Sequence, residues 1–159
     1  MRNSVWSNSD GLNVGFGTRT AEDNSGAAVS VSGKRQQISV RVVGGANIKD
    51  SDVTNQLWYG ATIPANALLE SAKLFVTTAF VGTNAVMDIG TYNASTGAAI
   101  DDDGIDVAVA TATLADNAVI TCDGALIGTV LAADSKVGIT YDTAAFTAGE
   151  ATLIIEYVV

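Results

Sequence analysis

The feature that most constrains the fold is an alternation of apolar and polar residues between Ser71 and Ile89. Successive side chains of a strand point to opposite faces of its sheet, so this alternation predicts half-buried strands. Gly82 and Asn84 interrupt the pattern, and both residue types tolerate the positive φ angles of a tight turn. We therefore predict a central antiparallel hairpin between Ser71 and Tyr92. Its inward face takes Ala72, Leu74, Val76, Phe80, Ala85, Met87 and Ile89, and its outward face takes Ser71, Lys73, Phe75, Thr77, Val86 and Asp88.

Similar patterns elsewhere predict further strands. Gln37–Val43 alternates cleanly, with Ile38, Val40 and Val42 on one side. Roughly eight strands at regular spacing, separated by turn residues, are typical of a sandwich or jelly roll. The fold class that we predict is all-β: an antiparallel β-sandwich or jelly roll with one short helix in a connection. The other predicted strands are Ala118–Thr121, Leu126–Leu131, Lys136–Asp142 and Ala151–Val158.

Residues 104–114 allow two interpretations. Ile105, Ala108, Val109 and Ala112 recur at helical spacing, and Asp103 stands where a helix N-cap would be, which predicts a short helix from Gly104 to Leu114. The β-branched residues of the segment could equally alternate as a strand, because such side chains are disfavoured in helices.

The N-terminal segment differs in composition from the rest. Residues 1–36 are dense in Asn, Ser, Gly and Thr and contain isolated apolar residues, among them Trp6 and Phe16. Such a segment cannot bury enough apolar surface to fold alone. It is either an arm that lies on a partner or a strand added to the edge of the domain's own sheet. We predict an N-terminal arm, 1–36, and a β-sandwich domain, 37–159.

Charge is distributed unevenly along the chain, whose net charge is −9. Residues 1–49 are basic overall, whereas the remainder is strongly acidic. The asymmetry either reflects chance and solubility or means that the two parts face different neighbours. The negative total disfavours nucleic acid and anionic membranes as partners.

The composition excludes several kinds of active site. The chain has no histidine and one cysteine, Cys122, so a Ser-His-Asp triad, a histidine metal site and an internal disulfide are impossible. We expect Cys122 to be a small buried hydrophobe. Nothing marks a pair of catalytic carboxylates, so we predict that the protein is not an enzyme and uses no cofactor.

Two further groups have competing interpretations. The cluster Asp101, Asp102, Asp103 and Asp106 is either a solvated loop or a weak calcium site, and its spacing does not match that of an EF-hand. We favour the solvated loop and predict no metal. Trp58 and Tyr59 are either a core plug, which we favour, or a platform for a ligand.

Two predicted strands carry apolar residues on the face that the alternation predicts to be exposed to solvent. Phe75 lies between Lys73 and Thr77, and the last strand places Ile154 and Val158 on its outer side. Such residues are buried either within the monomer or against another subunit. We assign Phe75, Ile154 and Val158 to a predicted oligomer interface.

Four segments resemble a family of small virion structural proteins of tailed bacteriophages, associated with the head. They are VWSNSDGLNVGFGTRTAED (5–23), IPANALLESAKLFVTTAF (63–80), AIDDDGIDVAVATATLA (99–115) and YDTAAFTAGEATLIIEYVV (141–159). Each motif is loose, but their shared order along most of the chain gives the match its specificity.

The resemblance implies a non-enzymatic protein that decorates or cements the outer surface of the capsid after assembly in the host cytoplasm. The implied partner is the major capsid protein, with self-association into a homo-oligomer, for which we favour a trimer. The alternative is a receptor- or glycan-binding module of a head or tail fibre, with Trp58, Tyr59 and Tyr92 as its candidate aromatic residues. We predict that the arm binds the capsid through Arg2, Trp6, Leu12, Val14, Phe16, Arg19, Lys34 and Arg35.

Overall fold

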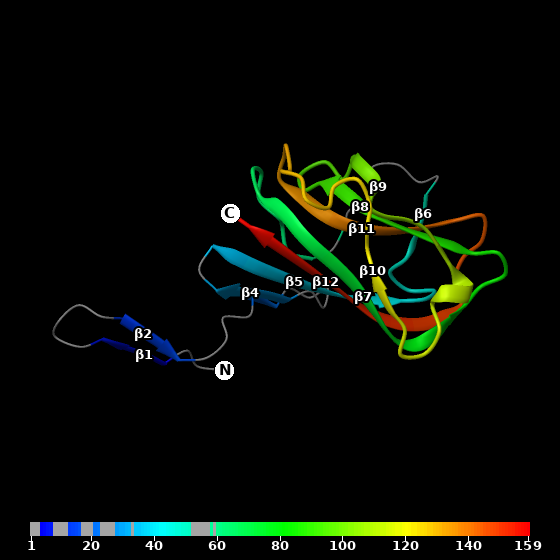
Figure 1. Ribbon diagram of the computed structural model, residues 1–159, viewed down its shortest axis with the longest axis horizontal. Helices are drawn as coiled ribbons and strands as arrows, with labels where there is room; N and C mark the ends of the chain where they lie inside the picture. The colour runs from blue at the N-terminus through cyan, green and yellow to red at the C-terminus, as the bar shows by residue number, and fades with distance from the viewer. Residues whose placement is uncertain are drawn as a thin grey trace.

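The computed structural model describes residues 4–7, 13–16, 21–22, 28–32, 34–51, 58 and 60–159. Side chains are placed in residues 34–51, 58 and 60–159. The described part contains two packed β-sheets, which form the two layers of a β-sandwich, and a separate two-stranded sheet (Figure 1). This confirms the predicted all-β sandwich, whereas the jelly-roll connectivity stays a prediction.

The larger layer is a six-stranded antiparallel sheet with the strand order β10-β7-β12-β5-β4-β3. The long strands β7 and β12 lie side by side at its centre, and β5 flanks β12 (Figure 1). The sheet contains β3 (Ala21–Glu22), β4 (Ala28–Ser32), β5 (Arg35–Val43), β7 (Leu68–Val81), β10 (Val119–Thr121) and β12 (Ala148–Val158).

The smaller layer is a four-stranded sheet with the order β6-β11-β8-β9. Its strands pair antiparallel, except for the short β6, which runs parallel to β11. The sheet contains β6 (Lys49–Asp50), β8 (Val86–Asn93), β9 (Ala99–Ala110) and β11 (Ser135–Asp142). A separate two-stranded sheet pairs β1 (Ser4–Ser7) with β2 (Asn13–Phe16).

The hydrophobic core lies between the two main sheets. Leu74 of β7 and Leu153 of β12 are opposite each other on the inner face of the larger sheet, and both are fully buried. Met87 and Ile89 of β8 are fully buried in the smaller layer. Burying each such side chain stabilises the fold by about 1.5–3 kcal/mol, so this aliphatic contact holds the layers together. The predicted inward residues of 72–89 are all buried, which confirms the alternation.

The predicted pairing of that segment is wrong. β7 belongs to the six-stranded sheet and β8 to the four-stranded sheet, so residues 71–92 do not form a hairpin. The connection crosses from one layer to the other over the end of the core, where Ala85 is buried. A Cβ on Gly82 would lie 2.6 Å from the Cβ of Ala85 and 3.3 Å from the Phe146 ring, so the chain needs glycine at this crossing. The alternation identified the two faces of each strand but carried no information about its partner.

The helix predicted for Gly104–Leu114 is also wrong. Residues up to Ala110 continue β9, and the only helical turn there is a three-residue 3-10 segment, Thr111–Thr113. The cause is a β-bulge, since Ile89 pairs with Asp106 whereas Met87, two residues away on β8, pairs with Val109. Ile105 and Val109 of the predicted helical stripe are both buried in the core although they are four residues apart, which imitates helical spacing, whereas Ala108 and Ala112 are exposed. Asp103 lies within the strand and caps no helix.

The strand predicted for Leu126–Leu131 does not form. Ile127 N–H donates to the Gly124 carbonyl at 3.0 Å and Thr129 N–H to the Leu126 carbonyl at 3.1 Å, so the segment is a series of turns. Gly128 has a φ of 80°, in the left-handed region, which departs from the extended backbone of a regular strand. The other strands are confirmed, as β5, β10, β11 and β12.

The predicted arm, residues 1–36, contains β1 to β4. β4 pairs with β5 and β3 with β4, so these two strands extend one edge of the six-stranded sheet. β1 and β2 pair with each other. Among the residues that the structure describes, no helix has the length and apolar character needed to cross a membrane.

Candidate interaction surfaces

The first candidate surface is the β1–β2 hairpin, whose backbone register is described. Trp6 pairs with Val14 and Ser4 with Phe16, whereas Val5 pairs with Gly15. Directly opposed residues belong to the same face of a sheet, and alternate residues along a strand share that face. The register therefore assigns the three predicted anchors Trp6, Val14 and Phe16 to one face of the hairpin and Val5 to the other. Three further predicted residues, Arg2, Leu12 and Arg19, lie outside the described residues.

The last two predicted capsid-binding residues, Lys34 and Arg35, lie at the start of β5 and are exposed. The Arg35 guanidinium makes a bidentate ion pair with Glu70 of β7, with Nε 2.6 Å from Oε2 and Nη2 2.9 Å from Oε1. The hydrogen bond and the charge of Glu70 raise the pKa of Arg35. Arg35 is thus already paired within its own chain, whereas Lys34 makes no ion pair among the described residues.

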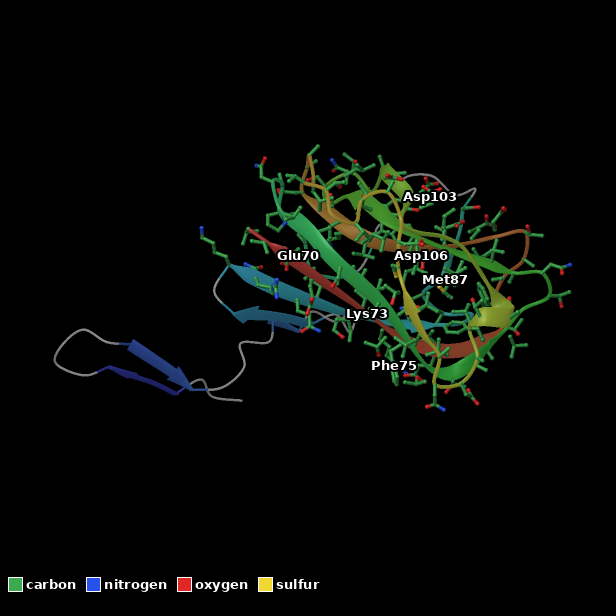
Figure 2. All side chains as sticks on the ribbon, in the orientation of Figure 1. Glu70, Lys73, Phe75, Met87, Asp103 and Asp106 are labelled. Atoms are coloured by element: carbon green, nitrogen blue, oxygen red, sulfur yellow. The ribbon has the colours of Figure 1, made fainter. Side chains whose placement is uncertain are left out.

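The second candidate surface is the outer face of the six-stranded sheet. The predicted interface residues Phe75, Ile154 and Val158 belong to this face, since Phe75 is opposite Thr152, Ile154 opposite Lys73 and Val158 opposite Arg35. Phe75 is 41% exposed. Figure 2 shows Glu70, Lys73 and Phe75 following one another along β7.

Sequence reasoning missed one member of this face, Val119. It is 58% exposed and lies directly opposite Phe75 in the pairing of β10 with β7. The strand Ala118–Thr121 was predicted, but its neighbour is 44 residues away along the chain. The alternation of apolar residues gives no signal for such a partner.

The charges on this outer face compensate one another. Arg41 Nε lies 2.7 Å from Glu150 Oε1, which forms a second ion pair beside that of Arg35 and Glu70. The Ser71 hydroxyl donates to Glu156 Oε2 at 3.1 Å. On the three strands β5, β7 and β12, three basic residues thus accompany three acidic ones: Arg35, Arg41 and Lys73 with Glu70, Glu150 and Glu156.

The outer face of the four-stranded sheet is acidic by comparison. Asp88 of β8 accepts the Ala108 N–H at 2.7 Å across the bulge of β9. Burial raises the pKa of Asp88, and the charges of Asp103, Asp142 and Asp102 raise it further, while the Ala108 hydrogen bond lowers it. Carboxylates from three neighbouring strands therefore repel one another on this face.

Asp101, Asp102 and Asp103 place carboxylate oxygens within 4.8 Å of one another, close enough to share a cation. Asp102 and Asp103 are exposed, and carboxylates in such a position are well hydrated without an ion. Calcium takes six to eight oxygens, of which this cluster supplies a minority. The absence of a metal requirement stays a prediction.

An aromatic pair covers part of the four-stranded sheet's outer face. The Trp58 and Tyr92 rings are 4.2 Å apart at 40°, and both side chains are buried. They pack over Gly138 of β11, where an added Cβ would lie 2.2 Å from the Tyr92 ring and 2.7 Å from Trp58. Lys49 Nζ lies 4.5 Å from the centre of the Trp58 ring, a cation–π contact. Trp58 is thus buried, but on the outer side of the four-stranded sheet and not in the core between the layers, so the predicted core plug is wrong in its place; Tyr59 lies outside the described residues.

A buried polar pair, Asp106 and Cys122, lies where β9 and β10 close one side of the sandwich. Gly124 N–H donates to the Ile105 carbonyl at 2.9 Å and Leu126 N–H to the Gly104 carbonyl at 2.7 Å, joining the two layers. Burial raises the pKa of Asp106, while a hydrogen bond with Cys122 lowers it. Burial, together with the Asp106 charge, raises the pKa of the Cys122 thiol to about 12. Cys122 is therefore buried, as predicted, and the raised pKa favours its protonated thiol.

No family model matches this sequence, and no curated protein gives a significant match. The fold is similar to that of a chain in the Cyanophage Pam1 capsid asymmetric unit, at 15% identity. That match covers 87% of this chain and 98% of the other, with a TM-score of 0.52. A chain in the capsid of Ralstonia phage GP4 matches at 17% identity, over 76% of this chain and 83% of the other, with a TM-score of 0.44. At 15% identity, the Pam1 match shows a shared fold.

Proposed function

We propose that this protein is a non-enzymatic structural component of a tailed-phage virion that decorates or cements the outer surface of the capsid. Its partner is the major capsid protein. The observation that carries the proposal is the fold shared with a chain of the Cyanophage Pam1 capsid asymmetric unit. The match extends over most of this chain and nearly the whole of the other.

The chemistry of the described residues agrees with a structural role. The chain has no histidine, and its single cysteine is buried beside Asp106. A buried thiol with a raised pKa is a poor nucleophile, because the thiolate is the reactive form. The candidate sites are instead two surfaces: the outer face of the six-stranded sheet and the β1–β2 hairpin.

The capsid-binding element of the proposal is the N-terminal arm, residues 1–36. An isolated two-stranded hairpin is at best marginally stable in water, so β1–β2 needs a covering surface. The register assigns Trp6, Val14 and Phe16 to one face, and buried aromatic residues dominate the energy of most interfaces. This face of the hairpin is the anchor on the shell.

Charge has a smaller part in this binding. Arg35 is occupied by Glu70, which leaves Arg2, Arg19 and Lys34 of the predicted basic set to steer the arm to the shell. Exposed charges affect orientation and association rate more than affinity. Raising the salt concentration should therefore slow attachment without stripping attached protein.

The alternative function, binding of a receptor or glycan, receives no support from Trp58 and Tyr92, the two described residues among the three aromatic residues that suggested it. Trp58 and Tyr92 are both buried, and each covers the other. A sugar-binding platform requires an exposed aromatic face.

The test is cosedimentation with empty shells of the major capsid protein encoded in the same genome. The full chain should pellet with the shells, and failure to do so would refute the proposed function. A chain that begins at Thr18 lacks β1 and β2 but keeps β3 and β4, and it should stay folded by circular dichroism and lose binding. A chain that begins at Gln36 should also stay folded, because β5 still pairs with β12, and should not bind.

A matched pair of substitutions separates the two faces of the hairpin. Trp6→Ala should weaken shell binding by about tenfold or more, as expected for an interface anchor. Val5→Ala, on the opposite face of the same strand, should leave binding unchanged. Equal effects of the two substitutions, or full binding by the chain that begins at Thr18, would refute the role of the hairpin while leaving decoration intact.

A further inference from the structure

The outer face of the six-stranded sheet has an apolar centre. Phe75 and Val119 lie directly opposite each other on β7 and β10, and they are 41% and 58% exposed. Ile154, on β12, lies opposite Lys73 in the next row of the sheet. Exposed apolar side chains are ordinary when scattered singly, whereas contiguous ones mark a contact surface.

The charges around this centre narrow the choice of partner. The chain has a net charge of −9, so two copies repel each other over most of their surface. The part of the six-stranded sheet formed by β5, β7 and β12 departs from that excess, since the three basic residues on these strands match the three acidic ones. Two copies that meet here turn their acidic four-stranded sheets away from the contact.

Burial of this face would leave few charges without a partner. Arg35 and Arg41 keep their partners Glu70 and Glu150 on the same chain, so covering them does not create an isolated buried charge. Lys73 makes no ion pair among the described residues and lies beside Ile154 at the centre of the face. Its ammonium is available to a carboxylate of the neighbouring copy.

We propose that the outer face of the six-stranded sheet, centred on Phe75 and Val119, is the surface through which copies of this chain associate. The occupant is a second copy of the chain. The association is a property of the purified protein and does not depend on capsid binding. In a virion, it would place the acidic sheets on the outside of the oligomer.

The test is the molar mass of the full chain, measured by size-exclusion chromatography with light scattering over a range of concentrations. The wild-type chain should be an oligomer at micromolar concentration, with a trimer favoured by the resemblance to phage virion proteins. Phe75→Glu and Val119→Glu should each raise the dissociation constant by more than about tenfold, as expected for residues at the centre of an interface. Phe75→Thr, which suits a strand, should have the same effect and guards against misfolding.

The matched control is Val107→Glu. Val107 is 53% exposed and lies on β9 of the four-stranded sheet. It is therefore about as exposed as Val119 but does not belong to the proposed interface. The control should leave the oligomer intact. A wild-type chain that stays monomeric, or an oligomer that dissociates in Val107→Glu but not in folded Phe75→Thr, would overturn the proposal. Cosedimentation of the same variants with shells then reports on decoration separately.

Discussion

The outer faces of the two sheets differ in how they are covered and charged. The six-stranded sheet leaves Phe75 exposed among paired charges of both signs. The four-stranded sheet covers part of its face with Trp58 and carries mutually repelling carboxylates around Asp88. One face is suited to contact with another protein, and the other is suited to remain in water.

This difference changes the meaning of the charge asymmetry in the sequence. The basic first third and the acidic remainder predict two parts that face different neighbours. The structure instead brings Arg35 and Arg41 from the first third against Glu70 and Glu150 from the remainder. The asymmetry is therefore partly cancelled on one sheet and concentrated on the other. Pairing between distant strands decides where charge accumulates, and linear charge patterns do not show it.

The largest expected effect comes from removing an aromatic ring from each outer face. Trp58→Ala should lower the free energy of unfolding by about 3 kcal/mol or more, because a buried ring leaves a cavity when truncated. Phe75→Ala, measured on the monomer, should change it by only about 0.5 kcal/mol, since Phe75 is 41% exposed. Urea unfolding monitored by circular dichroism measures both. Similar losses for the two variants would mean that the faces are covered alike.

A smaller effect is expected from placing an alanine on each outer face. Gly138→Ala places a Cβ 2.2 Å from the Tyr92 ring and should cost about 1–3 kcal/mol by forcing the aromatic pair away. Ser39→Ala, opposite Ile154 on the other sheet, should stay within about 0.5 kcal/mol of the wild type. The same unfolding experiment checks both. A neutral Gly138→Ala would show that the Trp58–Tyr92 cover is loosely packed.

The two layers should also respond to pH in opposite directions. The hydrogen bond and charge of Arg41 lower the pKa of Glu150, whereas burial raises the pKa of Asp106. A raised pKa in the folded state means that Asp106 stabilises the fold when protonated and that this contribution is lost as the pH rises through its folded pKa. Glu150 does the reverse, because its contribution disappears as the pH falls through its folded pKa.

Asp106→Asn tests that contrast. Asparagine keeps a side-chain oxygen to accept the Val107 N–H, which Asp106 Oδ1 accepts at 3.0 Å, but it carries no charge to bury. The variant should therefore melt at a higher temperature than the wild type at pH 7. The difference should shrink as the pH falls toward the ordinary aspartate range, where the wild-type carboxyl is protonated. A difference that does not change with pH would assign the effect to packing rather than to charge.

Local patterns in the sequence predicted the faces of the strands better than their partners. Alternation identified the buried side of 72–89 because it depends only on which residues must leave water. It could not place β7 and β8 in different sheets, since Gly82 and Asn84 suit a crossing as well as a hairpin.

The same limit applies to the candidate surfaces. Phe75, Ile154 and Val158 could be named from the sequence because each is apolar on a nominally wet side. Val119 and the Arg41–Glu150 pair could not, because both depend on pairing between distant strands. The bulge at β9 shows the remaining difficulty, since an inserted residue turns strand spacing into apparent helical spacing.

The smallest expected effect concerns cations on the acidic face. Asp101, Asp102 and Asp103 bring three carboxylates together, but two of them are exposed and hydrated, so a bound cation would replace few of its waters. Adding EDTA should therefore leave the melting temperature unchanged, and millimolar calcium should raise it no more than sodium chloride of equal ionic strength, which only screens repulsion. Asp103→Ala should behave as the wild type does toward both salts. A calcium-specific rise of several degrees that is lost in Asp103→Ala would mean that the acidic face holds an ion, because a ligand that binds only the folded state stabilises it in proportion to its occupancy.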